Sequence, residues 1–110
     1  MPRRAHPDAL ALAIGRRIKA LREEAGLKQE QLVFAADFRS KGHLSSLEKG
    51  LVMPTVATLR VLADGLGLSV VDLVNDPESS DRARVIELTR SLPSGVLKKL
   101  ARELSSVKKR

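Results

Sequence analysis

The side chains best suited to chemistry gather between positions 39 and 49, where the chain reads RSKGHLSSLEK. Leu44 and Leu47 have the spacing of a buried helical face, so the polar residues around them are free to face a partner. Ammonium, guanidinium, imidazole and hydroxyl groups donate hydrogen bonds to phosphate oxygens and to acceptor atoms on base edges. The stretch is therefore a candidate for binding an anionic partner.

Catalytic chemistry lacks its usual parts in this sequence. There are two histidines, His6 and His43, no cysteine, no glycine-rich phosphate loop and no carboxylate cluster at metal spacing. The Gly65-Leu66-Gly67 stretch is too short for a dinucleotide-binding fingerprint and follows a predicted helix instead of a strand. We expect no enzymatic activity, no catalytic residue, no metal and no cofactor.

The charge balance favours a polyanion or an anionic membrane surface as partner. Lysine and arginine number 20 against 13 aspartates and glutamates, which gives a net charge of +7 at pH 7. Most of the excess lies in residues 77–110, which carry +5, whereas residues 1–76 carry +2. Only two aromatic residues, Phe34 and Phe38, are present, which argues against base stacking on single strands. If DNA is the partner, we expect a duplex read by helices.

The N-terminus is basic and then mildly apolar. Asp8, Arg16 and Arg17 interrupt the apolar stretch, which therefore fits neither a signal peptide nor a membrane span. We expect a soluble, cytoplasmic protein with no membrane partner, and a basic N-terminal arm over residues 1–8.

Apolar periodicity predicts five short helices and no alternating strand pattern, so the expected fold is all-α. The helices are predicted at 9–25, 28–36, 40–48, from Pro54-Thr55 to Gly65–Gly67, and at 70–75. Ser40 is expected to cap the third helix, and Gly26 and Gly50 to close the first and third. The side chains predicted to face the core are Leu10, Ile14, Ile18 and Leu21; Leu32 with Val33 or Ala36; Leu44 and Leu47; Val56, Leu59, Leu62, Ala63 and Leu66; and Val70 or Val71 with Leu73 and Val74.

Three stretches in order, GRRIKALREEAGLKQEQL, SKGHLSSLEKG and PTVATLRVLADGLGL, resemble the lambda-repressor/Cro-like helix-turn-helix family, also called the XRE family. The resemblance covers roughly residues 9–75. It implies a five-helix, lambda-repressor-like DNA-binding domain over residues 9–76. In that fold the helix at 28–36 crosses the DNA backbone and the helix at 40–48 enters the major groove. Asp37 stands where the family frequently has glycine, at a turn position that favours left-handed backbone.

The resemblance also implies roles for single residues. Gln29 matches the position whose side chain and backbone N–H hold a phosphate. Arg22 and Glu48 match a partly buried ion pair between the first helix and the end of the third. Apart from the resemblance, glycine at position 42 has no Cβ, so the helix could approach a phosphate or base edge closely there.

The remaining candidates follow from position on the third helix. The residues free to face DNA are Lys41, Gly42, His43, Ser45 and Ser46, of which Lys41 and Ser46 are the base-reading candidates. Arg39 and Lys49 are candidates for phosphate contact, and His43 is a candidate for contact with a phosphate or a base. Ser40, at the start of the helix, is also counted among the DNA-binding candidates. Each of these polar residues could instead be a solvated surface group.

Residues 77–110 are expected to form a C-terminal helical extension. Pro77 to Ser80 is a linker by composition, and helices are predicted at about 81–92 and 95–107, which would form a helical hairpin. The second of these helices carries an apolar stripe of Leu97, Leu100, Leu104 and Val107. The stripe either forms a dimer interface or packs back on the chain's own domain, and the sequence leaves both open.

The leading hypothesis is a sequence-specific, double-stranded DNA-binding transcriptional regulator that acts as a repressor. The family usually binds as a dimer on two half-sites, so a homodimer on palindromic DNA is expected. The alternative is a protein-interaction subunit on the same scaffold, such as an antitoxin-like or anti-repressor partner. The nearly balanced charge of residues 1–76 keeps this alternative open.

Overall fold

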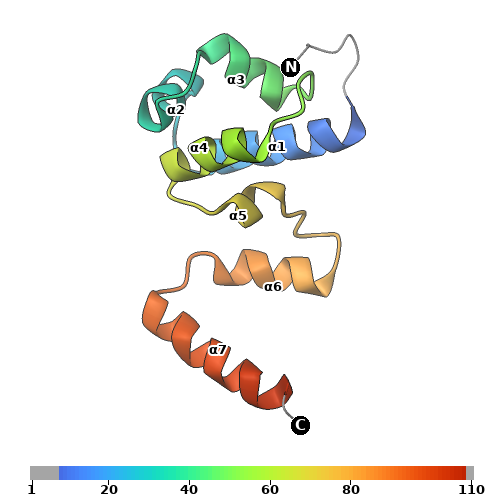
Figure 1. The fold of residues 1–110 in the computed structure, drawn as a ribbon, viewed down its shortest axis with the longest axis vertical. Coiled ribbons are helices and arrows are strands. Elements are labelled where there is room, and N and C mark those ends of the chain that lie inside the picture. The colour runs from blue at the N-terminus through green and yellow to red at the C-terminus, as the bar shows by residue number, and fades with distance from the viewer. Residues whose placement is uncertain (1–7, 109–110) are drawn as a thin grey trace. The chain divides into compact units, whose positions relative to one another are not determined.

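The computed structural model describes residues 8–108, and every regular element in that range is an α-helix (Figure 1). The expected all-α fold is thereby confirmed. The chain divides after Asp76 into two compact units. The first unit contains α1 (Ala9–Glu24), α2 (Gln29–Ala36), α3 (Lys41–Glu48), α4 (Val56–Leu66) and α5 (Val70–Val74). The second contains α6 (Asp81–Thr89) and α7 (Ser94–Lys108).

Helix α1 begins at a side-chain cap and ends at a glycine. The Asp8 carboxylate accepts hydrogen bonds from the backbone N–H groups of Leu10 and Ala11, at 3.0 and 3.1 Å. Gly26 has φ +74°, the left-handed conformation expected of a closing glycine. The prediction for Leu10 is wrong, because its side chain is 61% exposed while Ala11 is fully buried. Ala11 lies three residues before Ile14, so the buried face of the first turn passes through position 11.

The turn between α2 and α3 uses left-handed backbone at Asp37, where φ is 50° and ψ is 46°. The N–H of Phe38 donates to the Val33 carbonyl at 2.9 Å, which closes the end of α2. Ser40 caps α3 as expected, since its hydroxyl accepts from the His43 N–H at 3.1 Å. The predicted core residues Leu44 and Leu47 of α3 are buried.

Two valines at the ends of short helices lie outside the core, contrary to expectation. Val56, the first residue of α4, is 73% exposed, and Val74, the last residue of α5, is also exposed. Both have the right spacing for the apolar face, but each lies at the end of its helix and its side chain is exposed there. The predicted residues of the helix interiors are buried or packed against the core, and they include Ile14, Ile18, Leu21, Leu32, Leu59, Leu62, Ala63, Leu66 and Leu73.

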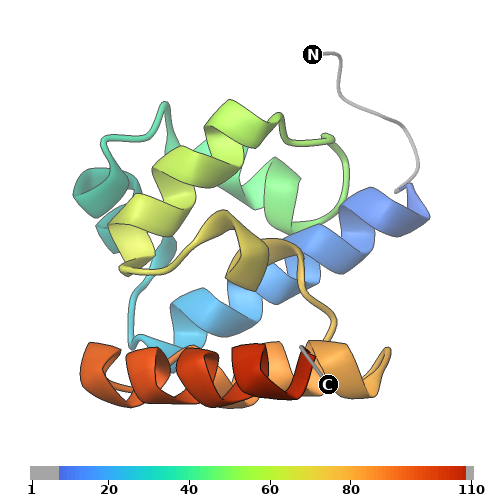
Figure 2. The same cartoon turned by 60° about the horizontal axis from the view of Figure 1, so that its bottom comes forward.

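Glycines allow two pairs of helices in the first unit to approach closely. The helices of this unit can be followed in Figure 2. Helix α1 packs against α3 and α5, and α4 packs against α2 and α5. A Cβ added at Gly15 of α1 would lie 2.2 Å from the Leu47 carbonyl oxygen of α3. A Cβ added at Gly65 would lie 2.6 Å from the Ala36 Cβ of α2. Gly65 is therefore a contact residue within α4, and Gly67, with φ +69°, closes that helix.

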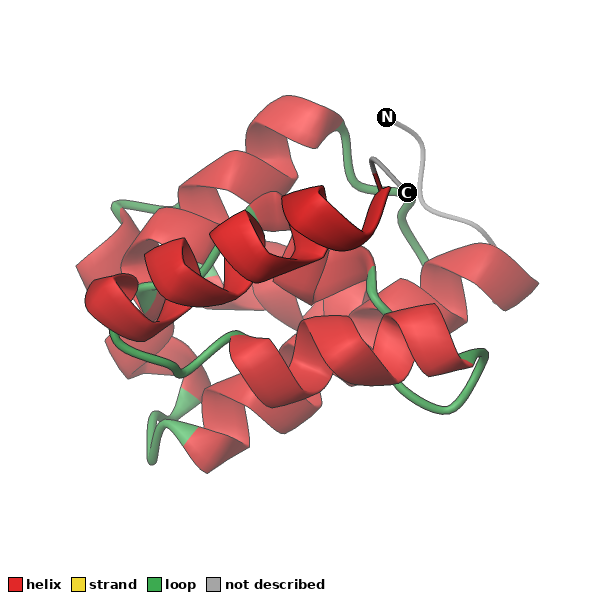
Figure 3. Ribbon diagram, turned by 90° about the horizontal axis from the view of Figure 1, so that it is seen from below, coloured by secondary structure: helices red, strands yellow, loops and turns green. Residues whose placement is uncertain are grey.

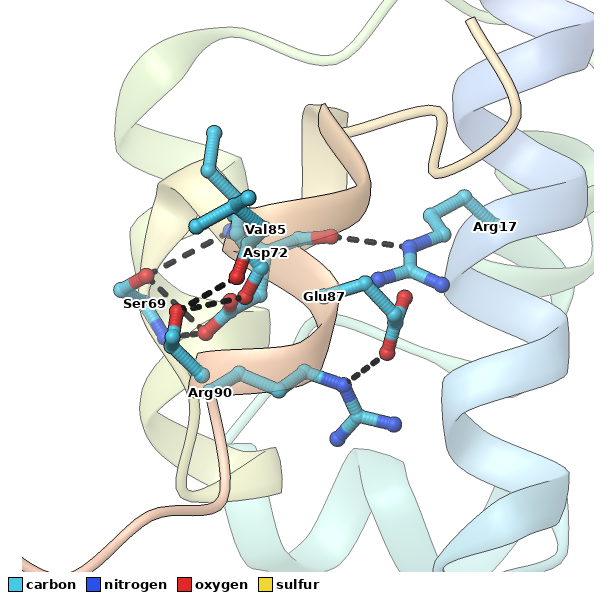
Figure 4. A network of polar contacts seen from close by, with 8 residues as sticks. Arg17, Ser69, Asp72, Val85, Glu87 and Arg90 are labelled. Carbon is cyan, nitrogen blue, oxygen red and sulfur yellow. Dashed lines mark hydrogen bonds and ion pairs between the residues drawn. The ribbon is translucent and has the colours of Figure 1, made fainter. Parts of the chain in front are cut away.

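Polar contacts hold the start of α5 (Figure 4). The Ser69 N–H and hydroxyl both donate to Oδ2 of Asp72 at 3.0 Å, and the Asp72 N–H returns a bond to the hydroxyl at 3.4 Å. This reciprocal arrangement is a capping box. The Nε of Arg17 on α1 donates to the Asp72 carbonyl at 2.9 Å, which ties α1 to α5.

Ser80 caps α6, the first helix of the second unit, by accepting from the Ala83 N–H at 3.0 Å. Figure 3 shows that the described part of the chain consists of helices joined by loops and turns. Helix α6 ends at Thr89, earlier than the predicted residue 92. Leu92 precedes Pro93, and the residue before a proline is disfavoured in helical backbone. Glu87 of α6 forms an ion pair with Arg90, the residue just after the helix, and the Thr89 hydroxyl donates to the Val85 carbonyl at 2.7 Å. None of the residues of α7 is buried.

Within residues 8–108, no helix is long and apolar enough to cross a membrane. The basic N-terminal arm expected over residues 1–8 lies outside the described residues except for Asp8. His6 and the terminal Lys109 and Arg110 also lie outside them.

Candidate nucleic-acid interface

Helix α3 presents a polar face opposite its buried leucines. Gly42 and Ser46 are one helical turn apart, and the spacing places them on the side away from Leu44 and Leu47. Gly42 is exposed and Ser46 is half-buried. The nearest atom to a Cβ added at Gly42 would be the Ser40 hydroxyl oxygen at 3.9 Å, so this position is open.

One flank of the face adjoins the start of α2. Gln29, the first residue of α2, lines a hollow of about 180 Å³ together with residues of α1 and the later part of α3. Two lysines border this hollow, Lys19 from α1 and Lys49 just beyond α3. The other lining residues are Arg22, Ser45 and Glu48.

The expected phosphate ligand Gln29 has its side chain engaged within the protein. Its Nε2 donates to Oε1 of Glu48 at 3.0 Å. The first N–H groups of a helix have no partner within that helix, so the backbone of Gln29 keeps a donor for an anion. The contact with Glu48 also orients the side-chain amide of Gln29. Nothing in the sequence indicates this contact.

The same Glu48 forms the expected pair with Arg22. Nε of Arg22 donates to Oε2 of Glu48 at 2.7 Å, and Nη2 donates to Oε1 at 3.0 Å. The side chains are 9% and 3% exposed. The hydrogen bond that Arg22 donates to Glu48 raises the pKa of Arg22 despite burial. Nη1 donates to the Leu27 carbonyl at 2.7 Å, so this network joins α1, α3, the start of α2 and the loop before it.

Lys41, at the start of α3, is not a free cation. Its Nζ lies 2.7 Å from Oε1 of Glu30 on α2, and the two side chains are 58% and 57% exposed. The hydrogen bond from Lys41 is the largest cause of a lowered pKa at Glu30. The sequence does not indicate this pair. The two residues are 11 positions apart and lie on either side of a turn, whereas helical periodicity relates only residues of one helix.

The other flank of α3 adjoins the start of α4. Arg39 and His43 line a hollow of about 220 Å³ with Thr55, which caps α4, and with Val52, Met53, Pro54 and Thr58. The His43 ring packs on Phe38 with 5.3 Å between ring centroids. Burial, followed by the charge of Arg39, lowers the pKa of His43. At neutral pH His43 is therefore a neutral imidazole that donates through one nitrogen and accepts through the other.

The structure thus brings most of the candidate residues onto α3 and its two flanks. Ser40 differs from the rest, because its hydroxyl already caps the helix. The described part of the chain has no group of three or more histidine, cysteine, aspartate or glutamate residues that could hold a metal ion. The arrangement offers hydrogen-bond donors and cations to an extended anionic partner.

Comparisons with known proteins agree with this arrangement. Residues 13–75 match a family model described as a helix-turn-helix domain. An uncharacterized HTH-type transcriptional regulator, y4dJ, of Sinorhizobium fredii is 43% identical over 67 residues, which are 61% of this chain and 86% of that protein. The immunity repressor protein of Bacillus phage phi105 is 35% identical over 65 residues, 59% of this chain. This chain covers only 44% of the phage protein.

A solved structure extends the likeness of fold beyond the matched domain. It is titled as a complex of the SinR and SinI proteins, and the superposition has a TM-score of 0.63. It covers 88% of this chain and 99% of the other, at 24% identity. At that identity the likeness shows the fold alone.

Proposed function

Because the chain belongs to the helix-turn-helix domain family and is a DNA-binding transcriptional regulator, we propose that it recognises a specific duplex through α3 and represses transcription there. In this proposal the outward face of α3 enters the major groove, where the donor and acceptor pattern distinguishes all four base pairs.

The observation that carries the proposal is the position of α3 between the starts of two other helices. Gln29 begins α2 on one flank, and Thr55 caps α4 on the other. Helix starts carry unpaired N–H groups and the positive end of the helix dipole, which favour phosphate. The phosphates that border a groove lie on both sides of an inserted helix, so two flanking anion-binding ends suit this placement.

The residues divide into two groups in this proposal. Lys41 and Ser46 contact base edges, and Gly42 between them allows close approach. The residues proposed to contact phosphates or support that contact are Gln29, Arg39, His43, Ser45 and Lys49. Ser40 acts indirectly by capping the helix that carries them.

We further propose that the protein binds a palindromic site as a homodimer. One small domain makes few base contacts, and two copies on half-sites about 34 Å apart would double them. The exposed apolar residues of α7 support a protein contact in the second unit, and they are Val96, Leu97, Leu104 and Val107. We also propose a cytoplasmic location, because a transcriptional regulator acts where its DNA lies.

Selection of bound duplexes from a random pool tests the proposal with the full-length chain. The expected result is an enriched motif with two inverted half-sites about one helical turn apart. The matched control is Ser46→Ala with Lys41→Ala, which should enrich a weaker or altered motif while keeping the thermal unfolding midpoint. A pool that stays random at low salt would contradict sequence-specific binding. The protein-interaction alternative is not favoured, because the relatives described above are named as transcriptional regulators or repressors.

A further inference from the structure

The ion pair between Glu30 and Lys41 places a negative charge on the surface that is proposed to meet DNA. Glu30 is the second residue of α2 and Lys41 the first of α3, and the two helices pack against each other. Their charged atoms are 2.7 Å apart, and both side chains are more than half exposed. An acidic group beside a residue that contacts DNA repels phosphate. Its presence there therefore lowers the affinity for DNA.

Resting on the proposed function, we propose that Glu30 is a specificity-determining residue that restrains Lys41 from phosphates and directs it to a guanine edge. The pair has no net charge, so its attraction to the phosphate backbone is far weaker than that of a free lysine. Sequence-independent affinity comes from that attraction. Glu30 would therefore reduce binding to unrelated DNA more than binding to the correct site.

The hydrogen-bonding capacity of Lys41 fits this role. An ammonium group has three N–H donors, and Glu30 takes one of them at 2.7 Å. Two donors remain, and guanine presents two acceptors in the major groove, O6 and N7. The carboxylate also fixes one end of a flexible side chain, which reduces the rotamer freedom that base contact would otherwise remove.

The ion pair between Glu30 and Lys41 is exposed to solvent. A buried pair would be needed for folding, whereas an exposed pair contributes little to stability. Glu30 and Lys41 are exposed, while Arg22 and Glu48 supply the buried contact at the other end of α3. Changing Glu30 should therefore alter recognition without unfolding the domain.

The test compares Glu30→Gln with the unchanged full-length chain. Glutamine keeps the size and an acceptor oxygen but removes the charge. Binding is measured by fluorescence anisotropy on the duplex selected by the unchanged chain and on a scrambled duplex, across a salt series. For Glu30→Gln we expect binding to the scrambled duplex to strengthen roughly two- to fivefold. The slope of log affinity against log salt should steepen by up to about one, and the ratio between the two duplexes should fall.

Two controls separate the pair from a general charge effect. Asp64→Asn removes one exposed acidic charge from α4 and should leave the ratio unchanged. In the Lys41→Gln background, Glu30→Gln should likewise leave the ratio unchanged, because the lysine that Glu30 holds is no longer present. The inference is overturned if Glu30→Gln leaves the ratio and the slope unchanged in the chain that has Lys41. It is also overturned if Glu30→Gln changes them by the same amount in the Lys41→Gln background as in the chain that has Lys41. If the unchanged chain selects no duplex at all, the proposed function fails and the inference fails with it.

Discussion

Glu48 is the residue on which three side-chain contacts converge, two from Arg22 and one from Gln29. Removing one partner of a buried ion pair leaves the other charge uncompensated. We expect Arg22→Ala or Glu48→Ala to lower the free energy of unfolding by about 3–5 kcal/mol. Urea unfolding followed by circular dichroism measures this change.

Arg16→Ala is the matched control for that experiment. Arg16 is an exposed residue of the same helix, and its removal should change the free energy of unfolding by no more than about 0.5 kcal/mol. Equal losses for Arg16→Ala and Arg22→Ala would contradict a structural role for the buried pair.

His43 makes the stability of the domain sensitive to acid. Its pKa is lowered from the ordinary value of 6.5, chiefly by burial. The unfolded chain therefore binds the proton more tightly than the folded chain. The stabilisation that neutral His43 gives the folded state is fully present above pH 6.5 and is lost as the pH falls through the pKa of His43 in the folded state. We expect His43→Gln to show a shallower loss of thermal stability between about pH 7 and pH 5. The other titrating groups are common to both proteins, and parallel curves would exclude His43 as a cause.

At the scale of elements, the closest approach joins α1 to α3. A Cβ at Gly15 would lie 2.2 Å from the Leu47 carbonyl oxygen and 2.9 Å from that of Glu48. Since backbone atoms cannot yield as a flexible side chain can, Gly15→Ala should separate the two helices. We expect a loss of at least about 2 kcal/mol in the free energy of unfolding.

Gly42→Ala is the corresponding change at a helix position that has room for a methyl group. Its Cβ would meet only the Ser40 hydroxyl oxygen at 3.9 Å, and alanine favours helix by up to about 1 kcal/mol over glycine. We expect thermal stability to be kept or raised. Affinity for a selected duplex should fall, because the added methyl group would stand on the face proposed to approach DNA. Unchanged affinity would show that no close approach occurs at this position.

Features that depend on a single helix could be predicted from the sequence. The Ser40 cap, the Gly26 and Gly50 ends and the interior leucines depend on local hydrogen bonding and on a period of 3.6 residues. Prediction from the sequence fails at Leu10, Val56 and Val74, which keep the period near helix ends but are exposed; at the start of α1 the buried position is Ala11 instead. The Glu30–Lys41 contact depends on the angle between two helices, which no period within either one encodes.

At the scale of the whole molecule, the exposed apolar residues of α7 are the candidates for contact with a second copy of the chain. Leu104 and Val107 are 54% and 60% exposed on this helix. We expect Leu104→Asp to shift the full-length chain from dimer to monomer in sedimentation velocity and to weaken binding to a palindromic duplex. Ser105→Asp adds the same charge at the neighbouring exposed position and should leave the dimer intact. Equal behaviour of the two variants would count against the apolar stripe as the interface.

Salt should act on the two proposed associations in opposite directions. Residues 77–110 carry a net +5, so two copies of the second unit repel each other and salt should strengthen their contact. Salt weakens DNA binding, because phosphate contact releases counterions. The dimer fraction without DNA should therefore rise with ionic strength while affinity for DNA falls.

The Glu48 network and the Gly15 contact have a consequence for how this protein could evolve. Both hold α3 by its buried side and its backbone, so its position does not depend on the residues at 42, 45 and 46. Substitutions at those positions can alter recognition at little cost to folding. A gene copy could therefore acquire a new target through changes at three codons, provided that Arg22, Gly15 and Glu48 are kept.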